Sequence, residues 1–321
     1  MELVEKMLQG ELQPLSRLIS LVERDAPEVP EIMKHIHPYL GRACLVGVTG
    51  PPGGGKSTLV DRLTRVARGR GLSVGIVAVD PTSPFSGGAV LGDRIRMQQH
   101  YLDPGVFIRS MATRGSRGGL PHTARGVIKL LDAFGKDLIL VETVGVGQTE
   151  LDIMEVTDTV IVVLVPEAGD AVQAMKAGLM EIASVFVVNK ADRQGVDRLI
   201  LELESMLKLG SHNSQWKPPI VATQAINDVG IEELYQAMER HREYLKDSGE
   251  LMRRKQQQRR EELLQRVEQR LRSRLCQLLR GDRGLASLIE KVEQGEMDPY
   301  TAAEMMEKEA LSRGWLLGEY T

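Results

Sequence analysis

Cysteine is scarce in this sequence. Only Cys44 and Cys276 occur among the 321 residues, and they are far apart in the chain. This scarcity excludes a disulfide framework and a cysteine-based metal site, and it fits a reducing compartment. An excess of positive charge is also missing, because the formal net charge is −3. A general nucleic-acid binder is therefore not expected.

Long apolar runs are missing as well. No segment approaches the roughly 18 consecutive apolar residues that a membrane span needs. Residues 1–7 contain acidic side chains and no uninterrupted apolar stretch. We therefore expect no signal peptide, no membrane association and a cytoplasmic protein. The chain length allows one large or two smaller domains.

Glycine, in contrast, is concentrated at 50–58, where four of nine residues are Gly. The stretch fits the phosphate-loop pattern G-x-x-x-x-G-K-[ST] in full. Its residues, all candidate nucleotide contacts, are Gly50, Pro51, Pro52, Gly53, Gly54, Gly55, Lys56, Ser57 and Thr58. The glycines let the backbone approach phosphate groups, and the predicted helix that follows directs its N-terminus at them. We expect Lys56 to contact the terminal phosphates and the Ser57 hydroxyl to bind Mg²⁺.

Apolar runs alternate with helical patterns from residue 41 to about 245. The runs predict strands at 43–48, 73–79, 106–109, 138–141, 159–165, 185–188 and 220–222. Continuous Val, Ile and Leu indicate strands covered on both faces, hence an α/β fold with a mostly parallel sheet. Ligands bind such sheets at the carboxyl ends of the strands.

The regions flanking this alternation differ from it. Residues 1–40 have helical apolar spacing broken by prolines, which predicts a small N-terminal helical extension before a nucleotide-binding domain at 41–248. Residues 249–321 predict a C-terminal helical arm, with a further helix starting at Asp298-Pro299. Within 251–280, ten Lys or Arg face three Glu, and apolar residues recur at spacings of three and four. Packing on a partner helix or a second subunit is the favoured interpretation, with RNA or membrane binding as alternatives.

Acidic residues stand at the ends of two predicted strands. Asp80 ends the second strand and opens a Gly-, Pro- and Ser-rich segment that reaches Asp93, a candidate switch loop. Both carboxylates could reach Mg²⁺ directly or through water. Glu142 ends the fourth strand, where a second acid on the metal side belongs.

The segment 143–150 after Glu142 predicts a second switch, in which the Gly145 amide donates to the γ-phosphate. Val146 follows Gly145 where a Gln would orient the attacking water. Gln148 is a candidate substitute, so the predicted catalytic residues are Lys56, Asp93, Glu142 and Gln148. Intrinsic hydrolysis should be slow, about 10⁻³ to 10⁻⁴ per second.

The sixth strand ends in Asn189-Lys190-Ala191-Asp192, which matches N-K-x-D. In this arrangement the Asp192 carboxylate accepts from guanine N1–H and the exocyclic N2 amine, Lys190 packs along the base and Asn189 braces the loops. Adenine offers no such donors, so the pocket should reject ATP at least tenfold. Thr223, Gln224 and Ala225 follow the last strand, and the Ala225 amide could reach guanine O6.

The combined motifs resemble the MeaB/ArgK family of P-loop GTPases, which are accessory proteins of adenosylcobalamin-dependent acyl-CoA mutases. The resemblance rests on 50–58, 79–81, 87–93, 142–148, 169–176 and 189–192. The sequence departs from the family at 166–168, where many members are glycine-rich, and at Gln224, often Ser.

This resemblance implies a GTP-driven chaperone, with Mg²⁺ and GTP or GDP bound, that gates cofactor loading and removal of damaged cofactor on a mutase. It implies that the C-terminal arm forms a homodimer. It also implies a third switch at 165–176 that communicates with the mutase through Asp170, Gln173 and Lys176. From the residues alone, that segment is only a loop-to-helix junction with Asp170 as a candidate N-cap.

Three alternatives remain at this point. One is a metal-insertion GTPase of the hydrogenase or urease type, for which the Cys and His content is sparse. Another is a protein kinase linked to amino-acid transport. The third is an RNA-binding scaffold that uses the basic arm.

Overall fold

The structure is a computed structural model that describes residues 1–80, 97–112, 120–121, 123–143, 152–166, 178, 180–210, 215–281 and 283–312. The chain divides into two compact units, Met1–Arg254 and Lys255–Thr321.

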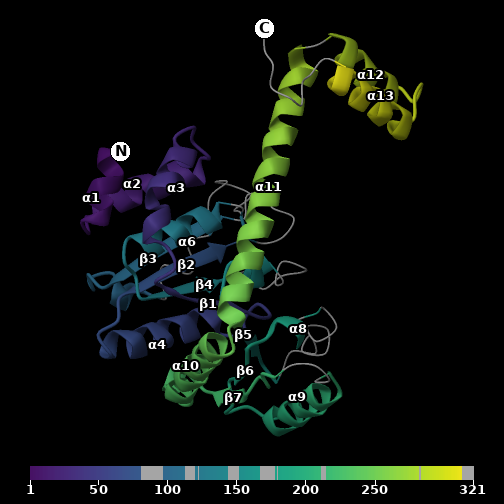
Figure 1. The fold of residues 1–321 in the computed structure, drawn as a ribbon. Helices are drawn as coiled ribbons and strands as arrows, with labels where there is room; N and C mark the ends of the chain where they lie inside the picture. The colour runs from purple at the N-terminus through teal and green to yellow at the C-terminus, as the bar shows by residue number, and fades with distance from the viewer. Residues whose placement is uncertain are drawn as a thin grey trace. The chain divides into compact units, whose positions relative to one another are not determined.

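A seven-stranded sheet organises the first unit (Figure 1). Its strands are β1 (Cys44–Thr49), β2 (Val74–Asp80), β3 (Val106–Ala112), β4 (Leu138–Glu142), β5 (Thr159–Leu164), β6 (Val185–Asn189) and β7 (Ile220–Thr223). Their order is β3-β2-β4-β1-β5-β6-β7, and every adjacent pair is parallel. The predicted α/β class is confirmed, and each predicted strand is present.

Three acidic or amide residues that the sequence placed at strand ends are the last residues of their strands. Glu142 pairs with Val48, and Asn189 pairs with Thr223. Asp80 ends β2 opposite Ala112. These pairings with neighbouring strands extend the ladder by one residue beyond the predicted ends. Polar residues therefore occupy paired positions at the carboxyl edge of the sheet.

Helices cover both faces of the sheet (Figure 1). They are α1 (Glu2–Leu8), α2 (Leu12–Glu23), α3 (Val29–Ile36), α4 (Lys56–Gly69), α6 (Ala124–Ala133), α8 (Met180–Ile182), α9 (Val196–Gly210) and α10 (Ile231–Asp247), with short 3₁₀ turns η1 (His37–Tyr39), η2 (Gln98–His100), η4 (Asp152–Glu155) and η6 (Ala225–Asn227). Residues of α1–α3, α6 and α9 share one hydrophobic core with one sheet face, and α4 and α10 share a second core with the other. This burial supplies most of the driving force for the layers.

The N-terminal helices pack against the sheet layer. Leu15, Leu18 and Ile19 of α2 are at most 1% exposed, and they belong to the same core as residues of α6. Arg109 of β3 also donates to Glu23 at the end of α2, with Nε 2.7 Å from Oε1. The segment 1–40 is thus helical, as predicted.

The second unit is helical. It contains most of α11 (Glu250–Gly281), which begins in the first unit, together with α12 (Arg283–Glu293) and α13 (Pro299–Ser312). The Asp298 carboxylate accepts from the amides of Tyr300 and Thr301, both at 3.0 Å, which confirms the predicted helix start. Among the described residues, no helix is both long and apolar enough to cross a membrane.

Candidate nucleotide-binding site

The phosphate loop lies at the centre of the carboxyl edge of the sheet, between β1 and α4. Gly50 and Gly55 have φ angles of +136° and +89°. A Cβ at Gly50 would collide with the Val163 carbonyl oxygen, and a Cβ at Gly55 would collide with Asn189 Nδ2. Side chains are excluded at both positions, so the loop backbone stays close to β5 and β6.

Lys56 is the first residue of α4 and is buried, with 6% exposure. Its Nζ donates to the carbonyl oxygens of Gly50 at 2.9 Å and Pro51 at 3.0 Å. The ammonium is therefore held inside the curve of the loop, where phosphate oxygens would compete for it.

Two hydrogen bonds join β1 and the phosphate loop to the end of β4 and the residue after it. The Ser57 hydroxyl donates to Glu142 Oε1 at 2.7 Å, and both side chains are buried. The Thr143 hydroxyl donates to Thr49 Oγ1 at 2.9 Å. Mg²⁺ takes hard oxygen ligands and binds through one or two protein groups besides substrate phosphates. The Ser57 hydroxyl and the Glu142 carboxylate fit that requirement.

Asn189 joins three segments at the opposite end of the site. Its Nδ2 donates to the Gly54 carbonyl at 2.8 Å, while Oδ1 accepts from the Thr223 hydroxyl at 3.0 Å and from the Ala225 amide at 3.1 Å. Lys190 follows with φ +58°, a left-handed conformation that is rare outside glycine. The amide that we predicted for guanine O6 therefore already has a protein acceptor.

One cavity of about 580 Å³ is lined by residues of all these segments. Predicted site residues in its lining are Pro52, Gly53, Gly55, Lys56, Ser57, Thr58, Glu142, Asn189, Lys190, Asp192, Gln224 and Ala225. Two further lining residues, Val79 and Thr143, lie in the 79–81 motif and the predicted second switch, whereas the sequence did not predict Ile226 and Asn227. Ile226 directly follows the predicted residue Ala225 and Asn227 comes next, and that proximity in sequence was the available signal. Asp192 is solvent-exposed in this wall.

Several predicted residues lie outside the described part of the chain. They are Asp93, Gly145, Gln148, Asp170, Gln173 and Lys176. Asp80 is described in its backbone only, as the end of β2.

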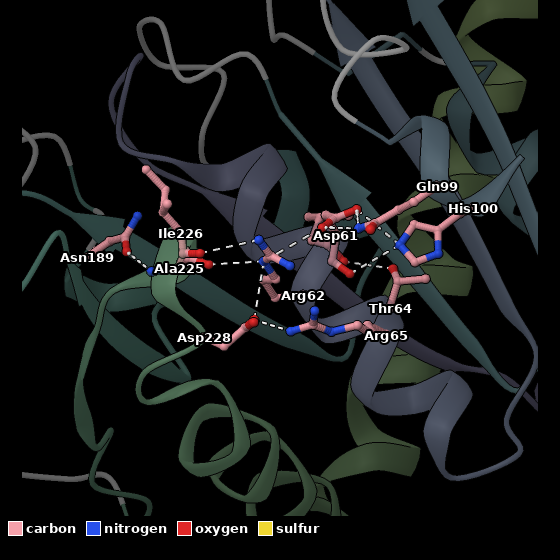
Figure 2. A network of polar contacts seen from close by, with 11 residues as sticks. Asp61, Arg62, Thr64, Arg65, Gln99, His100, Asn189, Ala225, Ile226 and Asp228 are labelled. Atoms are coloured by element: carbon pink, nitrogen blue, oxygen red, sulfur yellow. Dashed lines mark hydrogen bonds and ion pairs between the residues drawn. The ribbon is translucent and has the colours of Figure 1, made fainter.

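Helix α4 carries a polar network that no motif predicted (Figure 2). Asp61 accepts from Gln99 Nε2 at 2.6 Å and lies 3.1 Å from His100 Nε2. Burial opposes the charge of Asp61, but the hydrogen bonds from His100 and Gln99 outweigh burial and lower the pKa of this carboxyl. The next residue, Arg62, bonds in the other direction, to the turn at 225–228.

The parallel sheet, the phosphate loop at its central strand and the clustered N-K-x-D residues define a P-loop protein of the GTPase type. The sequence profile of the family described as "Methylmalonyl Co-A mutase-associated GTPase MeaB" matches residues 15–279. The chain therefore belongs to the MeaB family.

Individual relatives agree with this assignment. A protein of Pyrococcus abyssi that is named as a GTPase is 50% identical over 317 residues, covering 98% of this chain and 97% of the relative. GTPase ArgK of Escherichia coli is 33% identical, covering 94% and 93%. A crystal structure described as LAO/AO transport system kinase superposes with a TM-score of 0.69 at 27% identity, covering 96% of each chain.

A mammalian relative matches a shorter part of the chain. The Mus musculus protein "Methylmalonic aciduria type A homolog, mitochondrial" is 36% identical over 217 residues, which cover 66% of this chain and 52% of the relative.

Proposed function

We propose that this protein hydrolyses GTP and that its nucleotide state gates the loading of adenosylcobalamin, and the release of damaged cofactor, on an acyl-CoA mutase of the methylmalonyl-CoA type. The observation that supports the nucleotide part is the shared cavity. It joins the phosphate loop, the Ser57–Glu142 pair and the N-K-x-D residues in one site. The family description supports the mutase part.

The roles of the residues follow from their geometry. Lys56 would exchange its bonds to the Gly50 and Pro51 carbonyls for bonds to phosphate oxygens. Ser57 and Glu142 would hold Mg²⁺, which supplies charge neutralisation at the phosphates when bound. Asp192 would accept from the guanine base at the rim of the cavity.

The test measures GTP hydrolysis by the purified protein alone and with an adenosylcobalamin-dependent methylmalonyl-CoA mutase. We expect slow turnover alone, about 10⁻³ to 10⁻⁴ per second, because no Gln directly follows Gly145. We expect faster turnover with the mutase, and cofactor transfer to the mutase that differs between GTP and GDP. Equal rates with and without the mutase, together with nucleotide-independent transfer, would contradict the chaperone role.

A variant separates the partner function from the nucleotide site. Lys176→Ala should keep the intrinsic rate and lose most of the acceleration by the mutase, because the family resemblance assigns Lys176 to the third switch. The matched control is Lys208→Ala, on α9. Full acceleration of the Lys176 variant would remove this residue from the proposal.

The second unit suggests a homodimer. One stripe of α11 exposes apolar side chains at spacings of three and four, namely Leu264, Val267, Leu271 and Leu275. A second copy of this chain, offering the same stripe, would cover them. Light scattering should give twice the chain mass, and Val267→Glu with Leu271→Glu should give the monomer mass. The control Leu201→Glu, at an exposed position on α9, should leave the mass unchanged.

A kinase is the second candidate, favoured by the description of the solved structure at 27% identity. Incubation with GTP labelled in the γ-phosphate distinguishes the two. Label released as free phosphate supports hydrolysis, whereas label transferred to a protein supports the kinase.

A further inference from the structure

Arg62 is on α4, six residues after the phosphate-loop lysine, and it contacts the turn that follows β7 (Figure 2). Its Nε lies 3.1 Å from the Ala225 carbonyl and 3.3 Å from Asp228 Oδ1. A second guanidinium nitrogen lies 3.4 Å from the Ile226 carbonyl. The planar, always charged guanidinium is suited to several acceptors at once.

The turn that Arg62 holds is tightly closed. The Gln224 amide donates to the Val229 carbonyl at 3.0 Å, and the Asn227 amide donates to the Gln224 carbonyl at 2.9 Å. Asp228 has φ +61° and also pairs with Arg65, one turn further along α4. The turn is thus attached to α4 through two arginines.

Ala225 is fixed from both sides. Its amide donates to Asn189 Oδ1 at 3.1 Å, and its carbonyl accepts from Arg62. Asn189 in turn bonds to the Gly54 carbonyl of the phosphate loop. The base side of the cavity is therefore tied twice to the phosphate side, once through Asn189 and once through Arg62.

We infer that Arg62 is a positioning residue for base recognition. It holds Ala225 at a fixed distance from the phosphate loop, so that the Ala225 amide can exchange its bond to Asn189 Oδ1 for one to the O6 oxygen of a guanine base whose phosphates are already bound. This inference rests on the proposed guanine-nucleotide function. Arg62 itself contacts only protein groups.

The experiment compares GDP, IDP and ADP binding by isothermal titration calorimetry. GDP and IDP share O6, IDP lacks the 2-amino group of guanine, and ADP lacks both O6 and the 2-amino group. Arg62→Ala should weaken GDP and IDP by the same factor, about tenfold, since the base side loses a charged anchor. ADP affinity should stay within about twofold of wild type, because the phosphate loop is untouched. Arg62→Lys keeps the positive charge but not the planar guanidinium that reaches several acceptors, so its loss of GDP and IDP affinity should be intermediate.

The matched control is Arg70→Ala. Arg70 is the residue that caps the C-terminus of α4. It pairs with Glu232 of α10 and lies over the Tyr235 ring, so it contacts α10 and not the 225–228 turn. Its removal should lower the melting temperature without changing the ratio of GDP to ADP affinity. This control separates loss of an arginine contact on α4 from loss of base positioning.

The outcomes separate two failures. A wild-type protein that binds ADP as well as GDP would remove the proposed function itself. Only the role of Arg62 would be overturned if the wild type prefers GDP over ADP and the Arg62→Ala variant keeps the same preference. The same conclusion would follow if Arg62→Ala weakened the binding of all three nucleotides equally. If Arg62→Ala does not fold, the same comparison on Arg62→Lys decides, and an unchanged GDP preference there overturns the inference.

Discussion

Two buried lysines at opposite edges of the sheet show how the same chemistry serves different ends. At the carboxyl edge, Lys56 donates to the Gly50 and Pro51 carbonyls of the phosphate loop. At the amino edge, Lys136 donates to the Gly105 carbonyl at 2.9 Å. Burial, followed by the nearby charge of Arg68, lowers the pKa of Lys136. Lys56 lines the cavity, whereas Lys136 joins the segment before β4 to the segment before β3.

Other buried polar side chains repeat this division. Asp132 accepts from the amides of Gly41, Arg42 and Ala43, at 2.5, 3.1 and 2.8 Å, just before β1. At the carboxyl edge, Asn189 donates to the Gly54 carbonyl and Glu142 accepts from the Ser57 hydroxyl. Asn189, Glu142 and Ser57 all line the cavity. The difference teaches that burial of a polar group does not identify a site. The groups to test for function are those whose bonds face an accessible cavity.

Lys56→Ala should give the largest effect. GTP hydrolysis should fall about 10³-fold, equivalent to about 4 kcal/mol of transition-state stabilisation, because a preorganised charge at the phosphates is lost. Single-turnover phosphate release measures this rate. Lys136→Met is the control from the other edge: it should lower the unfolding free energy but keep the rate per folded molecule. Unchanged turnover of Lys56→Ala would remove the phosphate loop from the mechanism.

Asp132→Ala should produce the opposite pattern. Three backbone amides would lose their acceptor, so the free energy of unfolding should fall by about 3 kcal/mol. Nucleotide affinity of the folded fraction should not change. Urea unfolding, read by circular dichroism, measures the loss, with Asp247→Ala at an exposed position as control. A large drop in GDP affinity without a drop in stability would show that the two edges are not independent.

The sequence predicted the sheet and the short motifs because both leave local signals. Continuous Val and Ile runs marked the strands, and the phosphate loop and N-K-x-D residues are each contiguous. The Arg62 contact left no such signal, since it joins residues 163 positions apart. Nor does anything near Asp61 in the sequence indicate Gln99, 38 positions away. Contacts of this kind depend on how β7 and α4 are placed by the sheet.

Asp192→Asn should change the preference among purine bases, with a smaller effect than that of Lys56→Ala on hydrolysis. Losing the carboxylate should weaken GTP binding roughly 10- to 100-fold, and should favour xanthine nucleotides, whose C2 carbonyl needs a donor. Hydrolysis at saturating nucleotide should change little, because Asp192 lies at the rim and not at Lys56. Competition between GDP and XDP measures the preference. Wild-type selectivity in this variant would contradict the assignment of the base pocket.

Protonation of His241 should give the smallest change in stability. This residue lies at the amino edge of the sheet, beside the first residue of β5. Its Nδ1 lies 2.9 Å from the Thr159 hydroxyl, and its ring contacts the edge of Trp216 at 4.8 Å between centroids. Burial, reinforced by Arg254, lowers the pKa of His241 to about 4 from an ordinary value near 6.5. The unfolded chain therefore binds a proton between pH 6.5 and 4 that the folded chain does not, and stability falls as the pH falls through this window.

From pH 7 to pH 5 this histidine should lower the unfolding free energy by at most about 2 kcal/mol. Urea unfolding at several pH values measures the slope, and His241→Gln should reduce it while the exposed His35, varied in the same way, should not. GDP affinity measured over the same range should not follow His241, because that residue lies at the edge opposite the nucleotide cavity. A GDP affinity that changed with the His241 titration would contradict the separation of the two edges of the sheet.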